Sequence, residues 1–438
     1  MTYPKLTDEP GALETAARIR QGQLSPLEAT EAAIARIEAL DGAVNAVVIR
    51  DFVRARETAR GMTTPGPDQP LYGVPLTVKE SFDVAGLPTC WGLAEHAGTI
   101  AKTDAVVVQR LKRAGAVILG KTNVPPSLAD WQATNPVYGR TVNPHDPARS
   151  PGGSSGGSGA ALALGLVSAE YGSDIGGSIR IPAHFSGVWG HKTTWGVVTS
   201  KGQEFPGTDG HEVALGVVGP LARSGEDLAL LLEVTLDRPL ALAAKPVAQT
   251  RFLYLERHPL CPVADEVRAP IEAAVEAIEA AGGTIDRRSD LLPDLAALHG
   301  QYMRMLGIAM SRGAPGPDGQ VATAAQWFDL LDAQHHAQRD WAALFTEYDF
   351  VLAAPAALPA FAHDDRPMPE RVWEVAGELH GAEAVLAYTG MAVFAGLPAT
   401  VLPVGAAGHL PVGLQVIGDR FADRDCIAIA TAIGALLA

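Results

Sequence analysis

The chain has 438 residues, of which 47% are apolar and 19% are charged, a balance typical of a globular protein with a sizeable core. Asp and Glu outnumber Lys and Arg by 49 to 34, which gives a formal net charge of −15. An acidic surface repels phosphate backbones, so this charge disfavours nucleic acid as a partner.

Capping signals predict a first well-defined helix that begins at Pro26 and ends at Asp41-Gly42. Ser25 and Glu28 have the spacing of a capping box around this proline. Further along, the pattern predicts strands over 44–49, 71–78 and 116–119 and helices over 51–60 and 106–114. The recurrence of strand, helix and strand favours an α/β core.

Beyond residue 158 the chain changes character twice. A small-residue helix over 159–164 and a strand over 166–171 come first. Long amphipathic helices over 264–281 and 323–345 follow, together with a strand over 252–255. We expect Pro270 to break or kink the first of these two helices. Strands over 400–403 and 413–417 and a helix from Arg424 close the chain.

Three short segments combine residue types suited to nucleophilic catalysis. Lys79 directly follows an apolar strand, where burial would lower its pKa and make it a usable base. Glycines surround Ser154 in the run 152–159 and would let the backbone approach a reacting group. Ser178 follows Gly176 and Gly177, whose N–H groups could converge on an anion.

Each segment has an ordinary explanation when it is considered alone. A lysine at a strand end can keep its ammonium in water, a Gly/Ser run can be a flexible linker, and two glycines can form a simple turn. Other catalytic motifs fit less well. The run 152–156 matches the nucleophile elbow G-x-S-x-G, but a proline-rich loop precedes it instead of a strand, and the run lacks the ending of a phosphate-binding loop. No H-E-x-x-H motif and no CxxC pair suggests a metal site.

Taken together, the three segments resemble the amidase signature family. The family motifs are a lysine after G-V-P-x-x-V, a G-G-S-S-G-G run and G-S/T-D-x-G-G-S-I-R, and this chain has all three in order with fitting spacing. Further similar segments are found at 121–125, 135–144, 219–224, 396–399 and 410–415. The resemblance implies an α/β fold with a single large mixed β-sheet surrounded by α-helices.

The resemblance also implies one amidase domain over 1–438. Its parts would be an N-terminal helical part (1–70), the signature core (71–235), a variable helical region that forms the substrate pocket (240–390), and C-terminal strands and a helix (391–438). No family motif is recognised in the variable region.

The family's catalytic roles carry over residue by residue. Neutral Lys79 would accept a proton from Ser154, which is expected after a cis peptide bond, and Ser154 would take the proton of the nucleophile Ser178. The N–H groups of Ile175, Gly176, Gly177 and Ser178 would form the oxyanion hole. Ser155 would support Ser154 by hydrogen bonding, and Asp174 and Arg180 would brace the turn. No metal or organic cofactor is needed for this chemistry.

The substrate is expected to be a small hydrophobic or aryl amide. Leu128, Ala129 and Trp131 align with a family segment that lines the acyl side of the site. In the variable region, Tyr302, Met303, Met305 and Trp327 are candidates for pocket walls, although for any one of them a place in the helix core is the more common role. Members of this family cleave linear amides, and several also cleave esters, anilides or urethane-type carbamates, so a urethanase activity is one candidate.

Two alternatives stay open. The glutaminase subunit of tRNA-dependent amidotransferases has a similar fold, but Leu386 stands where that subunit has a carboxylate, and Val393 replaces its asparagine. A catalytically silent scaffold is the other alternative, which intact Lys79, Ser154 and Ser178 argue against. No signal or membrane-spanning segment is evident, and the three cysteines are too dispersed for a disulfide framework, so we expect a cytoplasmic protein. A homodimer is left open.

Overall fold

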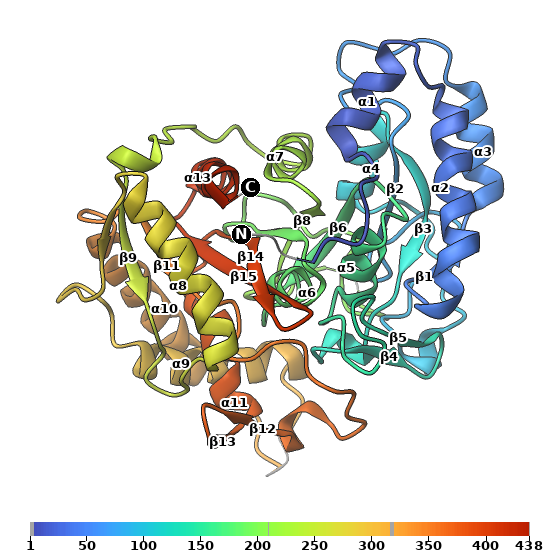
Figure 1. The fold of residues 1–438 in the computed structure, drawn as a ribbon. Coiled ribbons are helices and arrows are strands. Elements are labelled where there is room, and N and C mark those ends of the chain that lie inside the picture. The colour runs from blue at the N-terminus through green and yellow to red at the C-terminus, as the bar shows by residue number, and fades with distance from the viewer. Residues whose placement is uncertain (1–3, 209, 316–318, 438) are drawn as a thin grey trace.

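A single mixed sheet forms the centre of the computed structural model, which describes residues 4–208, 210–315 and 319–437 (Figure 1). In these residues the sheet has 11 strands, in the order β1-β3-β2-β6-β8-β7-β14-β15-β11-β9-β10. They are β1 (Val47–Arg50), β2 (Pro75–Lys79), β3 (Val117–Thr122), β6 (Glu170–Asp174), β7 (Trp189–Lys192), β8 (Val217–Ala222), β9 (Arg251–Leu255), β10 (Thr284–Asp286), β11 (Phe350–Ala353), β14 (Ala399–Ala407) and β15 (Leu410–Ile417). Two hairpins stand apart, β4 (Ala133–Asn135) with β5 (Gly139–Thr141) and β12 (Val372–Val375) with β13 (Glu378–Gly381).

Parallel and antiparallel pairs are mixed within the sheet. Strand β2 runs parallel to both β3 and β6, and β9 runs parallel to both β10 and β11. The strands between these two groups pair antiparallel. The sheet predicted by the family resemblance is therefore confirmed.

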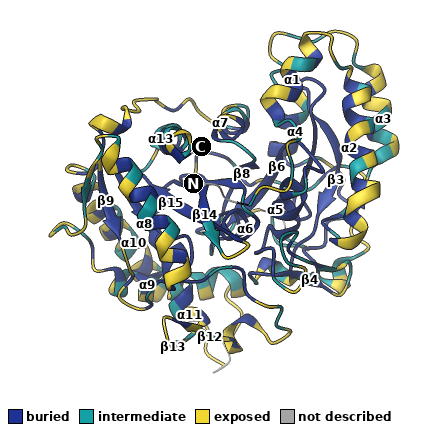
Figure 2. Cartoon of the chain, viewed as in Figure 1, coloured by how far each residue is buried: buried dark blue, intermediate teal, exposed yellow. Residues whose placement is uncertain are grey.

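Helices surround the sheet, and Figure 2 shows that their outer faces carry most of the exposed residues while the strands are buried. Helices α2 and α3 pack on each other and on β3, α6 packs on β14 and β15, and α8 and α13 pack on β14. The α-helices are α1 (Ala12–Arg20), α2 (Pro26–Leu40), α3 (Phe52–Gly61), α4 (Val106–Arg113), α5 (Gly156–Ala163), α6 (Arg180–Ser186), α7 (Gly225–Glu233), α8 (Asp265–Ala280), α9 (Leu295–Ser311), α10 (Ala324–Leu344), α11 (Ala382–Val385), α12 (Ala387–Phe394) and α13 (Asp423–Leu437). Short 3-10 helices are η1 (Asp41–Ala43), η2 (Ala94–His96), η3 (Pro126–Leu128), η4 (Val247–Gln249) and η5 (Met368–Glu370). No helix in the described residues is long and apolar enough to cross a membrane.

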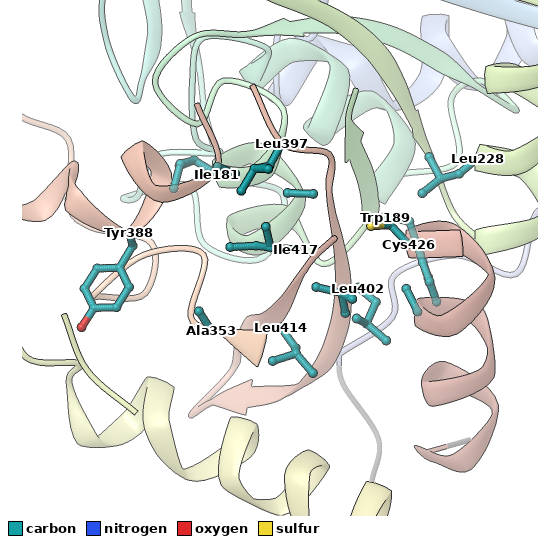
Figure 3. Close-up of a cluster of buried hydrophobic side chains, with 14 of the residues drawn as sticks. Ile181, Trp189, Leu228, Ala353, Tyr388, Leu397, Leu402, Leu414, Ile417 and Cys426 are labelled. Carbon is teal, nitrogen blue, oxygen red and sulfur yellow. The ribbon is translucent and has the colours of Figure 1, made fainter. Parts of the chain in front are cut away.

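The largest core cluster joins segments from the whole length of the chain. Figure 3 shows Trp189 of β7, Leu402 of β14 and Leu414 of β15 together with Cys426 of α13, and all four are buried. Tyr388 of α12 lies in the same cluster. Burial of this apolar surface fixes the central strands against the C-terminal helix, at roughly 25 cal/mol per Å² removed from water.

Several predicted elements differ at their ends. The capping box of Ser25 and Glu28 is present, and α2 begins at Pro26 as predicted. The strand predicted over 71–78 begins only at Pro75, and the one predicted over 166–171 begins at Glu170, because turns occupy the preceding apolar residues. The break predicted at Pro270 is wrong, since α8 continues through it. Pro270 lies only about one and a half turns into the helix, so its missing N–H removes a single hydrogen bond near the N-terminus.

Candidate active site

Three neighbouring elements bring the predicted catalytic side chains together. Lys79 is the last residue of β2, Ser154 lies just before α5, and Ser178 lies in the turn between β6 and α6. Because β2 and β6 are adjacent parallel strands, their carboxyl ends meet at one edge of the sheet. All three side chains are buried, with exposed fractions of 0% for Lys79, 1% for Ser154 and 5% for Ser178.

Lys79 forms the closest contact in this group. Its Nζ lies 2.7 Å from Ser154 Oγ and 2.8 Å from Ser173 Oγ. Burial lowers the pKa of Lys79 to about 7, although the charges of Asp174 and Glu80 act in the opposite direction. A substantial fraction of Lys79 is therefore neutral near pH 7 and can accept a proton.

The glycine before Ser154 is required by the space around it. The Gly153–Ser154 peptide bond is cis, as the family resemblance implied. A Cβ on Gly153 would collide with the backbone carbonyl oxygens of Asp130 and Gln132. Only glycine therefore allows this segment to lie against 130–132 and place Ser154 beside Lys79.

An ion pair braces the turn that carries Ser178, as the sequence predicted. Asp174 and Arg180 are fully buried, and Arg180 Nη2 lies 2.8 Å from Asp174 Oδ1. Burial alone would raise the pKa of Asp174, but the Arg180 charge outweighs it and lowers the pKa to about 2. The Asp174 carboxylate also accepts hydrogen bonds from the N–H groups of Gly177 and Ile179. Asp174 therefore stays ionised and fixes the path of the turn.

Three of the four predicted oxyanion donors are free. In the described part of the chain, the N–H groups of Ile175, Gly176 and Ser178 have no acceptor. The Gly177 N–H donates to Asp174 Oδ1 at 2.9 Å and so stabilises the turn itself. Contrary to the prediction, this N–H is not available to an oxyanion. The Gly177 φ of +96° and a Cβ position only 2.5 Å from Thr389 Cγ2 explain why a glycine stands there.

The predicted hydrogen bond from Ser155 to Ser154 is absent. Within the described residues, the Ser155 hydroxyl instead donates to the Ser173 carbonyl at 3.4 Å, and the Ser155 N–H donates to the Ser178 carbonyl at 3.1 Å. The reason is geometric, because Ser155 is the N-cap residue of α5 and faces the β6–α6 turn. Ser155 thus supports the nucleophile's backbone.

Two aromatic side chains hold the peptide groups of the same turn. Tyr302 on α9 donates its hydroxyl to the Ile175 carbonyl at 2.9 Å, and Trp131 Nε1 donates to the Gly176 carbonyl at 2.8 Å. The Ile175 carbonyl belongs to the same peptide unit as the Gly176 N–H. Tyr302 therefore sets the orientation of one free donor, a role that the sequence did not reveal.

A cavity of about 340 Å³ opens beside Ser178. It is lined by the three predicted substrate-binding residues Leu128, Ala129 and Trp131. Apolar side chains from the variable region complete most of the wall, namely Met303, Leu306, Met310, Met368, Pro369, Ala382 and Leu386. Of the other candidates in this region, Met305 is buried in the core, and Trp327 lines a separate surface hollow.

The charged groups of this cavity are acidic. Asp130 and Glu383 line it, and its lining contains no Lys, Arg or His within the ranges that the structure describes. Asp130 is paired with Arg371, whose Nη1 lies 2.6 Å from Asp130 Oδ1. An apolar acyl group therefore suits this cavity better than one that carries a carboxylate.

A second, much smaller cavity of about 40 Å³ also borders Ser178. Ser154, Ser173 and Gln203 contribute polar groups to it, and Trp91 and Val213 contribute apolar walls. Gln203 Nε2 donates to Ser173 Oγ at 2.9 Å and thereby joins the Lys79 network. Gln203 and Ser127 were not predicted, because nothing in their local sequence distinguishes them from other loop residues.

The large mixed sheet surrounded by helices is the fold of a known class of amide-hydrolysing enzymes, and comparison with known proteins identifies this class. The family model described as Amidase matches residues 28–299 and 317–427. The chain therefore belongs to the amidase signature family of enzymes that hydrolyse amides.

Individual relatives extend over nearly all of the chain. An indoleacetamide hydrolase of Bradyrhizobium diazoefficiens is 31% identical, over 96% of this chain and 85% of that protein. One of the subunits of the glutamyl-tRNA(Gln) amidotransferase of Deinococcus radiodurans is 30% identical, over 97% of each chain. Among solved structures, a crystal structure of an amidase superposes with a TM-score of 0.84 and 28% identity, covering 98% of this chain and 100% of that one.

Proposed function

We propose that this protein cleaves the C–N bond of small hydrophobic or aryl amides, with Ser178 as the nucleophile and Ser154 and Lys79 as a proton relay. The observation that carries the proposal is the buried 2.7 Å contact between Lys79 Nζ and Ser154 Oγ, beside a cavity that Ser178 also lines. A buried lysine with a lowered pKa beside a hydroxyl is typical of a functional site. Its neutral amine can accept a proton and so can act as a general base.

The first half of the reaction forms an acyl-enzyme. Lys79 accepts the Ser154 proton as Ser154 accepts that of Ser178, and Ser178 Oγ attacks the carbonyl carbon. The N–H groups of Ile175, Gly176 and Ser178 stabilise the resulting oxyanion, at about 3 kcal/mol per donor. The relay then returns the proton to the leaving nitrogen, and the C–N bond breaks. The same relay then deprotonates a water molecule, which hydrolyses the acyl-enzyme and releases the acid and free Ser178.

The apolar cavity argues against the glutaminase alternative. A free glutamine substrate carries an α-carboxylate, which would need a cation, and the described lining of the 340 Å³ cavity supplies only Asp130 and Glu383 as charged groups. A relative of the amidotransferase type is nevertheless similar over the whole chain. Glutamine therefore belongs in the substrate panel, alongside esters, anilides and urethane-type carbamates.

The proposed cellular location is the cytoplasm. Cys90, Cys261 and Cys426 are buried thiols without disulfide partners, which fits a reducing compartment.

Single substitutions test the proposed relay. Ser178→Ala, Ser154→Ala and Lys79→Ala should each lower kcat by about 10³-fold or more on the best amide of the panel, with an unchanged circular dichroism spectrum. Ser168→Ala is the matched control, because Ser168 is equally buried but bonds to Thr15 away from the site. A fluorophosphonate probe should label the parent and the control and leave Ser178→Ala unlabelled.

Two results would overturn this assignment. Wild-type turnover by Ser178→Ala would exclude Ser178 as the nucleophile, and an unlabelled, inactive parent would favour the scaffold alternative. A preference for free glutamine over every apolar amide would replace the proposed substrate class and require a partner protein.

A further inference from the structure

Arg371 and Asp130 form an ion pair at the wall of the cavity of about 340 Å³, which we call the acyl cavity. Asp130 lines this cavity, whereas Arg371 is not among its described lining residues. We infer that Arg371 is a specificity-determining residue, which neutralises Asp130 and so keeps the acyl cavity selective for uncharged over cationic acyl groups. The inference rests on the proposed function and deepens it, because it names the residue that sets this preference.

The geometry of the pair is that of a planar fork on a carboxylate. Arg371 Nη1 lies 2.6 Å from Asp130 Oδ1, and Arg371 Nη2 lies 2.7 Å from Asp130 Oδ2. Two parallel charge-assisted hydrogen bonds of this kind fix both the distance and the orientation of the two groups. Arg371 Nε donates to the Arg366 carbonyl at 2.8 Å, so the guanidinium is also held from the side away from Asp130.

Burial makes this neutralisation important. The side chain of Arg371 is 3% exposed and that of Asp130 is 20% exposed, so water reaches the pair poorly. A carboxylate in such a place is costly without its partner and attracts any cation that can approach it. Gln132 Nε2 also contacts Asp130 Oδ2, at 3.5 Å, but a neutral amide does not cancel the charge.

The other carboxylate of the acyl cavity is in a different situation. Glu383 is exposed, so solvent and salt screen its charge. The Asp130 charge is the one that water cannot screen, and Arg371 cancels it. The intact pair therefore leaves an acyl group with a mainly apolar wall and a weak electric field.

The pair also joins two parts of the cavity wall. Asp130 lies between the lining residues Ala129 and Trp131, and Arg371 directly follows η5, whose Met368 and Pro369 line the cavity as well. Substitution of Arg371 can therefore change the shape of the cavity in addition to its charge. A decisive test must compare acyl groups that have the same shape and differ only in charge.

The test compares two phenylacetamides, one with an uncharged para-ethyl group and one with a cationic para-aminomethyl group of the same size. We expect the parent to prefer the uncharged amide. In Arg371→Met the bare Asp130 carboxylate attracts the ammonium, so the ratio of kcat/KM for the uncharged over the cationic amide should fall by at least about tenfold. Ser178→Ala must abolish both activities.

Further variants separate charge from packing. The double variant Asp130→Asn/Arg371→Met removes both charges and should restore the parental ratio, although the fork is lost. Arg371→Lys keeps the charge and should stay within about threefold of the parental ratio. Arg366→Met is the matched control, because Arg366 belongs to the same segment but is exposed and pairs with Asp364 instead of Asp130.

Two results would overturn the inference. An unchanged ratio in Arg371→Met would show that Arg371 does not set the charge preference. A reduced ratio that persists in the double variant would show that the Asp130 charge is not the cause. If Arg371→Met does not fold, Arg371→Gln replaces it, since glutamine keeps an N–H donor for Asp130 and removes only the charge. Its ratio should fall while that of Arg371→Lys does not.

These outcomes are distinct from a failure of the proposed function. If cleavage depends on Ser178 but the charge preference is the same in the parent and in the charge-removing variants, the inference fails and the proposed function stands. If neither amide is cleaved and the fluorophosphonate probe does not label Ser178, the proposed function fails, and the inference with it.

Discussion

Burial makes Lys79 a usable base by lowering its pKa, so we expect its protonation to appear in the pH dependence of activity. Burial lowers the pKa of Lys79 to about 7. Only the neutral amine can accept the Ser154 proton, so activity is lost as the pH falls below this pKa. We expect kcat/KM to rise with pH through about 7 and to level off above it.

The measurement is a kcat/KM profile on a neutral amide between about pH 5 and pH 9, with a return to pH 8 after each exposure as a control for denaturation. Asp174, whose charge faces Lys79, has a pKa of about 2 and stays ionised over this range. A flat profile from pH 5 to pH 9 would contradict the assignment of Lys79 as the base.

Single side chains were predictable where a motif fixes them and were missed where only folding brings them close. Lys79, Ser154 and Ser178 belong to motifs, and the structure brings these three residues together at one edge of the sheet. Tyr302 contacts the Ile175 carbonyl from 127 residues away, on a helix whose sequence does not show which face meets the site. The engagement of the Gly177 N–H by Asp174 was also hidden, because spacing alone does not determine which N–H groups a carboxylate accepts.

The turn between β6 and α6 is held by two donors from other parts of the chain, Trp131 before β4 and Tyr302 on α9. Tyr302 fixes the peptide unit that carries the free Gly176 N–H, whereas Trp131 fixes the unit whose Gly177 N–H is already bound by Asp174. Tyr302→Phe removes the hydroxyl and keeps the ring. We expect this variant to lower kcat by about tenfold, because an oxyanion donor with a looser orientation stabilises the transition state less.

Steady-state kinetics on a primary amide check this expectation, and the split between kcat and KM is the informative readout. Tyr302→Phe should change KM little, since Tyr302 does not line the acyl cavity. Tyr388→Phe is its control, because Tyr388 is equally buried but donates to the Cys261 carbonyl. If Tyr302→Phe raises KM at constant kcat, the hydroxyl acts in binding and the orienting role is wrong.

Helices with capping signals were located more accurately than the strands. Ser25 and Thr323 both form capping boxes, and α2 and α10 begin directly after them. The apolar residues at 71–74 and 166–169 form turns because burial alone does not distinguish a strand from a buried loop. Pro270 is tolerated in α8 because only one hydrogen bond near the helix start is lost.

The strand order could not be predicted from local patterns, since it depends on contacts between distant parts of the chain. Strand β7 pairs with β14, with Gly190 opposite Val401. This pairing joins the signature core to the C-terminal strands, and the family resemblance supplied the expectation of one sheet where periodicity could not. The boundaries proposed along the chain therefore mark sequence regions whose strands pair in one sheet.

A continuous sheet predicts that the whole chain unfolds as one unit. The N-terminal strands β1, β3 and β2 are linked to β9 and β10 through an unbroken series of paired strands. The largest core cluster also contains residues from both regions, such as Leu76 of β2 and Val351 of β11. Loss of either region would expose the apolar surface of the other, so we expect a single thermal transition.

Calorimetry of the parent and of two core variants tests this cooperativity. Val117 in β3 and Val351 in β11 are both fully buried, toward opposite ends of the sheet. Val117→Ala and Val351→Ala should each lower the temperature of the same single peak, because either cavity costs the common folded state about 1–3 kcal/mol. Val53→Ala, at a residue that is 71% exposed, is the control and should leave the peak in place. A thermogram with two peaks, of which each core variant shifts only one, would show that the two ends of the sheet unfold as separate units.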